Sequence, residues 1–151
     1  MCEVRCYSWP EFHIRDGLAI LTKDMTAFLL MGDYALKVTL KAGFKSDGAS
    51  FPCFLADRLG GRFQRPLIGA VFFHDFLYKL HLLDRKDADL IFLSLCDIFG
   101  VRRDNSRIMY WFIRMFGWSH WDDATEEEYR NASRFCKLTI HTFQDRNKMR
   151  F

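Results

Sequence analysis

Alternating apolar and polar side chains mark the first structured part of the chain. One apolar run covers residues 27–31, and in residues 34–40 every second position is apolar. Gly32 and Asp33 lie between the two segments, and this pair suits a two-residue turn that needs positive φ angles. The first 45 residues are therefore expected to be β structure, with a hairpin over 27–40.

Residues 41–62 show neither a strand period nor a helix period. They are rich in glycine and contain Pro52. A stretch of this kind predicts a long ordered loop, and long ordered loops in compact domains often serve a function.

Helical patterns dominate after residue 65. An apolar run from Pro66 to about Leu82 predicts a buried central helix. Asp84, followed by Asp87, is placed like an N-cap and predicts a second helix that ends near Phe99 before Gly100. Two antiparallel helices are expected here.

Two further helices and a final extended segment are expected in the remainder. One helix runs from Asp104 or Asn105 to Phe116 and ends at Gly117. Another begins at Thr125, whose pairing with Glu128 fits a capping box. Residues 136–143 alternate enough to form a strand or an extended arm.

These patterns predict an α+β fold in which an N-terminal β-hairpin region packs on a helical bundle with two central antiparallel helices. The chain has 151 residues, of which 50% are hydrophobic and 27% are charged, as in one globular domain over 1–151. This composition excludes a disordered or collagen-like chain. The sequence shows no internal repeat and no linker.

The net charge and the cysteine content indicate which partners and which cellular compartment to expect. The net charge of +3 does not favour a nucleic-acid partner. The five cysteines show no CxxC spacing, so neither a disulfide framework nor a zinc ribbon is expected. No signal peptide is recognised at the N-terminus, and the longest uncharged apolar stretch, 66–73, is too short for a transmembrane segment. We expect synthesis in a reducing cytosol.

The candidate chemistry gathers in the two central helices. His74 and Tyr78 are four residues apart and share a helix face, and a short hairpin brings Asp89 against that face. This set suits hydrolysis by an activated water: His74 as general base, Asp89 orienting the imidazole, Tyr78 holding Asp89, and Asp75 binding a cation. The alternative is a buried polar network that only stabilises the helices.

Two short motifs carry a first resemblance. The sequence HDFLY at 74–78 and ADLIF at 88–92 resembles the HDxxY and (A/I)DxxF pattern of the phospholipase A2 superfamily, chiefly its bacterial and parvoviral members. The resemblance implies a phospholipase A2-like helical hairpin and calcium as the cofactor. It also implies His74 as general base, Asp75 as calcium ligand, and Asp89 and Tyr78 as residues that steady the histidine.

A second resemblance covers more of the chain, from residue 41 to 121. GFKSDGASFP at 43–52, HDFLY and then RKDAD at 85–89 look like the GFxTDxASxP, HDxLY and RxxAD motifs of a tailed-phage family of unknown function. It implies a phage or prophage source and leaves residues 122–151 as a C-terminal extension. Asp47 is a candidate metal ligand and Ser50 a candidate substrate contact in this loop, and an Asx-turn or a helix cap explains both equally well.

Basic clusters lie beside aromatic residues in two parts of the chain. Such a surface can meet an anionic membrane, and a nucleic acid would use the same residues. The simpler explanation, which we favour here, is a solvated arginine face on an amphipathic helix. The clustered residues are Arg58, Arg62 and Arg65, and then Arg102, Arg103, Arg107 and Arg114 beside Tyr110, Trp111, Phe112, Trp118 and Trp121.

The leading hypothesis is a phage accessory hydrolase that acts on a lipid ester of the host envelope, made in the bacterial cytoplasm and carried in the virion or used for lysis. The alternative is a non-enzymatic virion or host-interaction protein, with phage structural proteins as partners and the hairpin as a scaffold. An HD-type phosphohydrolase ranks last, because its upstream candidate ligand His13 lies in a strand-like segment.

Overall fold

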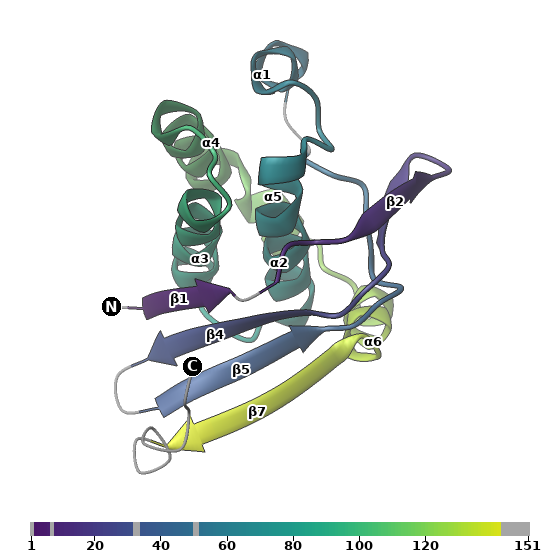
Figure 1. Ribbon diagram of the computed structural model, residues 1–151, viewed down its shortest axis with the longest axis vertical. Helices are drawn as coiled ribbons and strands as arrows, with labels where there is room; N and C mark the ends of the chain where they lie inside the picture. The colour runs from purple at the N-terminus through teal and green to yellow at the C-terminus, as the bar shows by residue number, and fades with distance from the viewer. Residues whose placement is uncertain (1, 7, 32–33, 50–51, 143–151) are drawn as a thin grey trace.

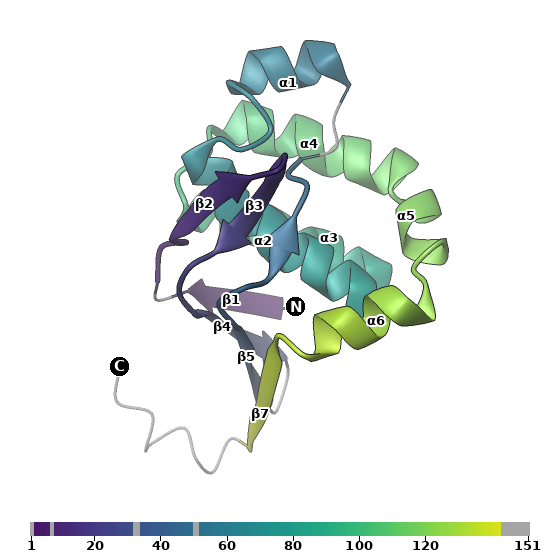
Figure 2. The same ribbon diagram turned by 90° about the vertical axis from the view of Figure 1, so that its right-hand side faces the viewer.

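The computed structural model describes residues 2–6, 8–31, 34–49 and 52–142. The fold is α+β, as the sequence predicts, with antiparallel strands followed by a helical region (Figures 1 and 2). No described helix is both long enough and apolar enough to cross a bilayer.

The main sheet has four antiparallel strands in the order β1-β4-β5-β7. The predicted hairpin is confirmed: Ala27 pairs with Val38 at its centre, and the turn residues Gly32 and Asp33 lie outside the described residues. The strands are β1 (Cys2–Cys6), β4 (Met25–Met31), β5 (Tyr34–Leu40) and β7 (Cys136–Thr142).

One strand of a smaller sheet and a short helix lie in the segment 41–62, which was expected to be a loop. The sheet has the order β2-β3-β6, with β2 (Phe12–Arg15), β3 (Leu18–Leu21) and β6 (Lys45–Ser46), and helix α1 spans Cys53–Leu59. The prediction of a loop throughout 41–62 was therefore wrong at β6 and α1. Both elements are too short to show a period, and they form because β6 pairs with β3 and because Leu55 and Leu59 of α1 are buried.

Among the described residues, four helices match predicted segments and two were not predicted, namely α1 and the short helix at 118–122. Asp84 precedes α3 but makes no side-chain cap hydrogen bond, whereas Thr125 and Glu128 form the predicted capping box of α6. The helices are α2 (Arg65–Leu80), α3 (Arg85–Ile98), α4 (Arg103–Phe116), the unpredicted α5 (Trp118–Asp122) and α6 (Glu126–Ser133).

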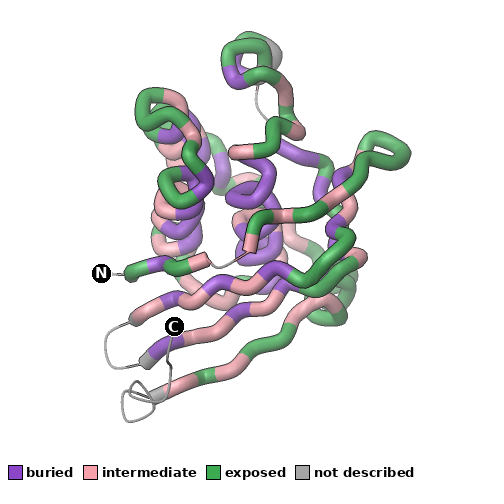
Figure 3. The backbone as a smooth tube through the Cα atoms, in the orientation of Figure 1, coloured by how far each residue is buried: buried purple, intermediate pink, exposed green. Residues whose placement is uncertain are grey.

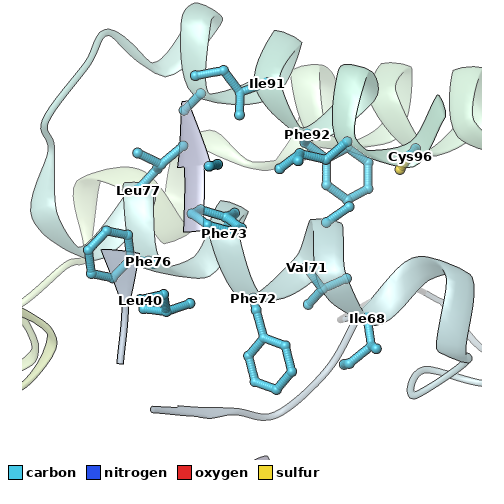
Figure 4. Close-up of a cluster of buried hydrophobic side chains, with 14 of the residues drawn as sticks. Leu40, Ile68, Val71, Phe72, Phe73, Phe76, Leu77, Ile91, Phe92 and Cys96 are labelled. Carbon is cyan, nitrogen blue, oxygen red and sulfur yellow. The ribbon is translucent and has the colours of Figure 1, made fainter. Parts of the chain in front are cut away.

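Helix α2 is central, and apolar side chains surround it, as its continuous apolar run predicts. It packs beside α3, and buried positions concentrate where the helices face one another and the sheet (Figure 3). Figure 4 shows a cluster of the buried hydrophobic side chains in this region. Its labelled residues are Leu40, Ile68, Val71, Phe72, Phe73, Phe76, Leu77, Ile91, Phe92 and Cys96.

The C-terminal part of the described chain contributes to the same core. Strand β7 pairs with β5 from Cys136 to Thr142, so the segment expected to be a strand or an arm is a strand of the main sheet. Helix α6 contacts α2, and its Ala132 is buried. These elements hold the helical layer and the sheet together around the candidate site.

Candidate functional site

His74 of α2 and Asp89 of α3 are joined at the centre of the helical hairpin. The imidazole Nε2 lies 2.9 Å from Asp89 Oδ1, and the hydroxyl of Tyr78 donates to the same oxygen at 2.6 Å. The predicted contact between His74 and Asp89 is thus confirmed. The rings of His74 and Tyr78 lie 4.1 Å apart between centroids, because residues four apart share one face of α2.

Two arginines complete the surroundings of Asp89. Arg114 of α4 donates Nη1 to Asp89 Oδ2 at 2.7 Å, and Arg85 Nη1 lies 3.8 Å from the same oxygen. Arg85 also donates to the carbonyls of Ile113 and Arg114 at the C-terminal end of α4. Neither arginine was predicted from the sequence to contact Asp89. The spacing of Arg85 and Asp89, four residues apart on one helix, was the available signal, and Arg114 had no local one.

These contacts keep Asp89 ionised although its side chain is fully buried. Burial alone would raise the pKa of this carboxyl, but hydrogen bonds from His74, Tyr78 and Arg114 outweigh it and hold the pKa below the ordinary value. An ionised carboxylate only accepts hydrogen bonds, so His74 Nε2 carries a proton. In the neutral imidazole, Nδ1 is therefore the basic nitrogen.

Aromatic contacts hold Tyr78 in place. Its ring meets Trp121 edge to face at 5.1 Å between centroids, and Trp121 stacks on His81 at 4.0 Å. Burial and the bond to Asp89 raise the pKa of the Tyr78 hydroxyl, so this group stays a hydrogen-bond donor. The hydroxyl of Tyr78 is therefore fixed as a support for Asp89.

Asp75, the next residue after His74, faces a different partner. Its carboxyl accepts a short hydrogen bond from the hydroxyl of Ser46 in β6, and Ser46 in turn accepts from the backbone N–H of Gly48. Burial raises the pKa of Asp75, Asp47 adds to the rise, and the Ser46 bond, His74 and Lys79 oppose it. Ser46 was not predicted as a site residue, although it lies inside the GFKSDGASFP segment.

A cleft of about 450 Å³ opens beside His74, Asp75 and Tyr78. Its walls are mainly apolar, and two lysines and His120 add positive or titratable groups. The lining residues come from β3, β6 and the loop after it, and from helices α2 to α6. Its other lining residues are Leu18, Lys45, Asp47, Gly48, Ala49, Val71, Lys79, Phe92, Phe112, Ile113, Phe116, Gly117, His120, Ala124 and Glu128.

The remaining candidate residues are placed as follows. Asp47 is exposed and lines the cleft, and Ser50 lies outside the described residues. His13, the ligand that a phosphohydrolase would need, is exposed in β2 and does not line the cleft. The structure therefore brings Asp47 to the cleft that holds His74 and Asp75, and places His13 elsewhere.

The donor set beside Asp75 is small for calcium, which takes six to eight oxygen ligands. Within the described part of the chain, no three His, Cys, Asp or Glu side chains gather where they could share a metal ion. Asp75 already accepts from Ser46, and Asp47 is the other carboxylate at this end of the cleft. The calcium site stays a prediction, and we derive no chemical step through calcium.

Comparison with protein families gives one match. Residues 25–113 match the family model described as "Protein of unknown function (DUF1353)". The chain belongs to the DUF1353 family. The DUF1353 segment runs from β4 into α4 and contains His74, Asp75, Tyr78 and Asp89. Comparison with curated proteins and with solved structures finds no match.

Proposed function

We propose that this DUF1353 protein is a hydrolase in which His74 activates water for attack on an ester held in the cleft. The observation that carries the proposal is the bond between His74 Nε2 and the ionised Asp89, which leaves Nδ1 as the base. The His74 side chain is 12% exposed, so it is buried enough to be oriented and still borders the cleft.

In the proposed reaction the oxygen of a water molecule attacks the ester carbonyl carbon while His74 Nδ1 takes the water proton. The bond between this carbon and the leaving oxygen then breaks, and the imidazolium returns the proton to the alkoxide. The products are a carboxylic acid and an alcohol. Asp89 stabilises the imidazolium in between, and Tyr78 and Arg114 keep Asp89 in position.

The lining of the cleft supports an amphiphilic substrate. Val71, Phe92 and Phe116 provide apolar walls that suit an acyl chain. Lys45 and Lys79 line the same cleft and would attract an anionic group. A lipid ester with a negatively charged head group combines both properties.

We also propose a phage setting for this hydrolase. The motifs at 43–52, 74–78 and 85–89 resemble those of tailed-phage proteins, and this resemblance supports a phage accessory hydrolase that acts on a lipid ester of the host envelope. Such a protein would be made in the bacterial cytoplasm and used in the virion or in lysis.

One observation favours a second candidate, a non-enzymatic scaffold. Asp89 of α3 is bonded to His74 and Tyr78 of α2 and to Arg114 of α4, so the network joins three helices. A network of this kind can fix a unique helix arrangement without chemistry. In a phage, such a scaffold would present its surface to virion or host proteins.

The test compares His74→Ala with His13→Ala, a histidine that is exposed in β2. Release of carboxylic acid is measured from anionic phospholipid vesicles and from a short-chain soluble ester, with calcium and with chelator. The hydrolase predicts turnover by the wild type and by His13→Ala, and a loss of about a hundredfold or more in His74→Ala. Activity that disappears in chelator and returns with calcium would support the calcium prediction.

Absence of turnover on both substrates, with a folded wild type, would overturn the hydrolase and leave the scaffold. In that case His74→Ala is expected to change only the free energy of unfolding, because the buried carboxylate of Asp89 loses one donor.

A further inference from the structure

The outward side of α4 carries apolar side chains where an amphipathic helix carries polar ones. Trp111 is 64% exposed and Met115 is 63% exposed, and Trp118 at the start of α5 is 59% exposed. The buried residues of α4, among them Met109 and Ile113, lie on the opposite side of the helix. Helix α4 is at the periphery of the helical layer, so this apolar side faces away from the core (Figure 1).

Opposite charges flank the apolar residues. Arg103 and Arg107 precede Trp111 by two helical turns and one, and they share its outward side. Asp122 and Asp123 follow Trp118 at the end of α5 and are exposed. Among the described residues these four charged side chains take part in no ion pair. We call this surface, consisting of Arg103, Arg107, Trp111, Met115, Trp118, Asp122 and Asp123, the α4–α5 face.

We propose that the α4–α5 face binds a second copy of this chain in an antiparallel, two-fold arrangement. A two-fold axis near the middle of the face brings Trp111 and Met115 of both copies together. The same axis brings Arg103 and Arg107 of each copy toward Asp122 and Asp123 of the other. The face is thus complementary to itself in charge and buries its own apolar centre.

The positions of the basic and acidic residues along the α4–α5 face favour a second copy over an anionic membrane as its partner. Arginines and tryptophans also suit a lipid surface. A membrane would place Asp122 and Asp123 against like charges at one end of the face, however, whereas a second copy places them against arginines. The α4–α5 face shares no residue with the lining of the cleft, so a dimer through this face does not depend on the proposed hydrolase.

The test is a charge swap, read by sedimentation equilibrium and light scattering on the full chain. The wild type is expected to dimerise, to twice the chain mass of 17.9 kDa. Arg103→Glu with Arg107→Glu places acids against acids and should raise the dissociation constant at least about tenfold, as should Asp122→Lys with Asp123→Lys. All four changes together restore complementary charges and should restore the dimer.

The control reverses two exposed cations outside the α4–α5 face, Arg15→Glu at the end of β2 with Lys23→Glu just after β3, and should leave the dimer intact. Trp111→Ser should weaken the dimer without altering the circular dichroism spectrum. A wild type that stays monomeric at about 100 μM would overturn the proposal. A quadruple variant that is as monomeric as the two double variants would also overturn it. So would binding of the monomer to anionic vesicles that Trp111→Ser abolishes.

Discussion

Arg114 donates its Nη1 to Asp89 Oδ2 at 2.7 Å, across the contact between α4 and α3. The Asp89 side chain is fully buried and the Arg114 side chain is 25% exposed, so water reaches only the cation of this pair. The pair matters to the site because Asp89 must stay ionised to accept the proton-bearing Nε2 of His74. Arg114 thereby links the position of α4 to the hydrogen bond that orients His74.

Removing this cation should destabilise the fold. Arg114→Met leaves the Asp89 carboxylate with fewer donors in a buried place, and the expected loss is about 1–3 kcal/mol in the free energy of unfolding. Urea denaturation of the two proteins measures it. Arg134→Met removes an exposed cation at the end of α6 and should cost less than about 0.5 kcal/mol. Equal effects of the two substitutions would contradict a special role for Arg114.

Asp75 should make stability fall as the pH rises. Its pKa is raised in the folded protein, so above the unfolded value of 3.8 the folded state binds the proton more strongly. Stability is therefore lost as the pH rises through the folded pKa. Asp75→Asn removes this dependence and should be more stable than the wild type at pH 7, with the difference vanishing below about pH 3.

The measurement is thermal unfolding against pH in buffer free of divalent cations. Asp57→Asn, at an exposed position of α1, is the matched control. A wild type that gains stability over Asp75→Asn as the pH rises from 4 to 7 would refute the assignment.

Gly117→Ala should disturb Tyr78. A Cβ at Gly117 would lie 2.5 Å from the carbonyl oxygen of Ile113 and 2.8 Å from the hydroxyl of Tyr78. Helix propensity alone predicts a gain, but the crowding should give a net loss of about 1–3 kcal/mol. Combining the change with Tyr78→Phe removes one of the two clashes, so the double variant should lose less than the sum of the single variants. Strict additivity would exclude the contact.

The capping box of α6 should be worth about 1 kcal/mol. The hydroxyl of Thr125 accepts from the N–H of Glu128, and the Glu128 carboxylate accepts from the N–H of Thr125. Thr125→Ala removes the first bond, while Thr125→Ser keeps a hydroxyl and should retain most of the stability. Chemical denaturation distinguishes the two. A Thr125→Ser variant as unstable as Thr125→Ala would contradict the capping role.

The part of the site that depends on local spacing was predictable. His74 and Tyr78 share a helix face by their separation, and the short connection after α2 folds Asp89 back against them. Arg114 was not predictable, because its partner lies 25 residues earlier and the rotation of α4 is set by packing. Gly117 was predicted as a helix stop. Its φ of −71° shows that the close approach of the Ile113 carbonyl and the Tyr78 hydroxyl, rather than a left-handed conformation, makes a side chain unfavourable there.

The elements of the fold also differ in whether a local sequence pattern predicts them. The hairpin of β4 and β5 and the helices α2, α3, α4 and α6 have periods long enough to detect. The short elements β6 and α5 have two and five residues and depend on neighbours that a local pattern does not reveal. For this reason Ser46 was not predicted as a site residue, since the pairing of β6 with β3 places it beside Asp75.

His74 and Asp75 are neighbours in sequence, yet one is bonded to α3 and the other to β6. Successive side chains on a helix point about 100° apart, so α2 is fastened on two sides at the same level. Turning the helix about its long axis would break both bonds together, and sliding it along that axis would do the same. The α2 wall of the cleft is therefore held against both rotation and sliding, and we expect any adjustment to ligands of different size in the walls from α4, α5 and α6, at residues such as Phe116, His120 and Glu128.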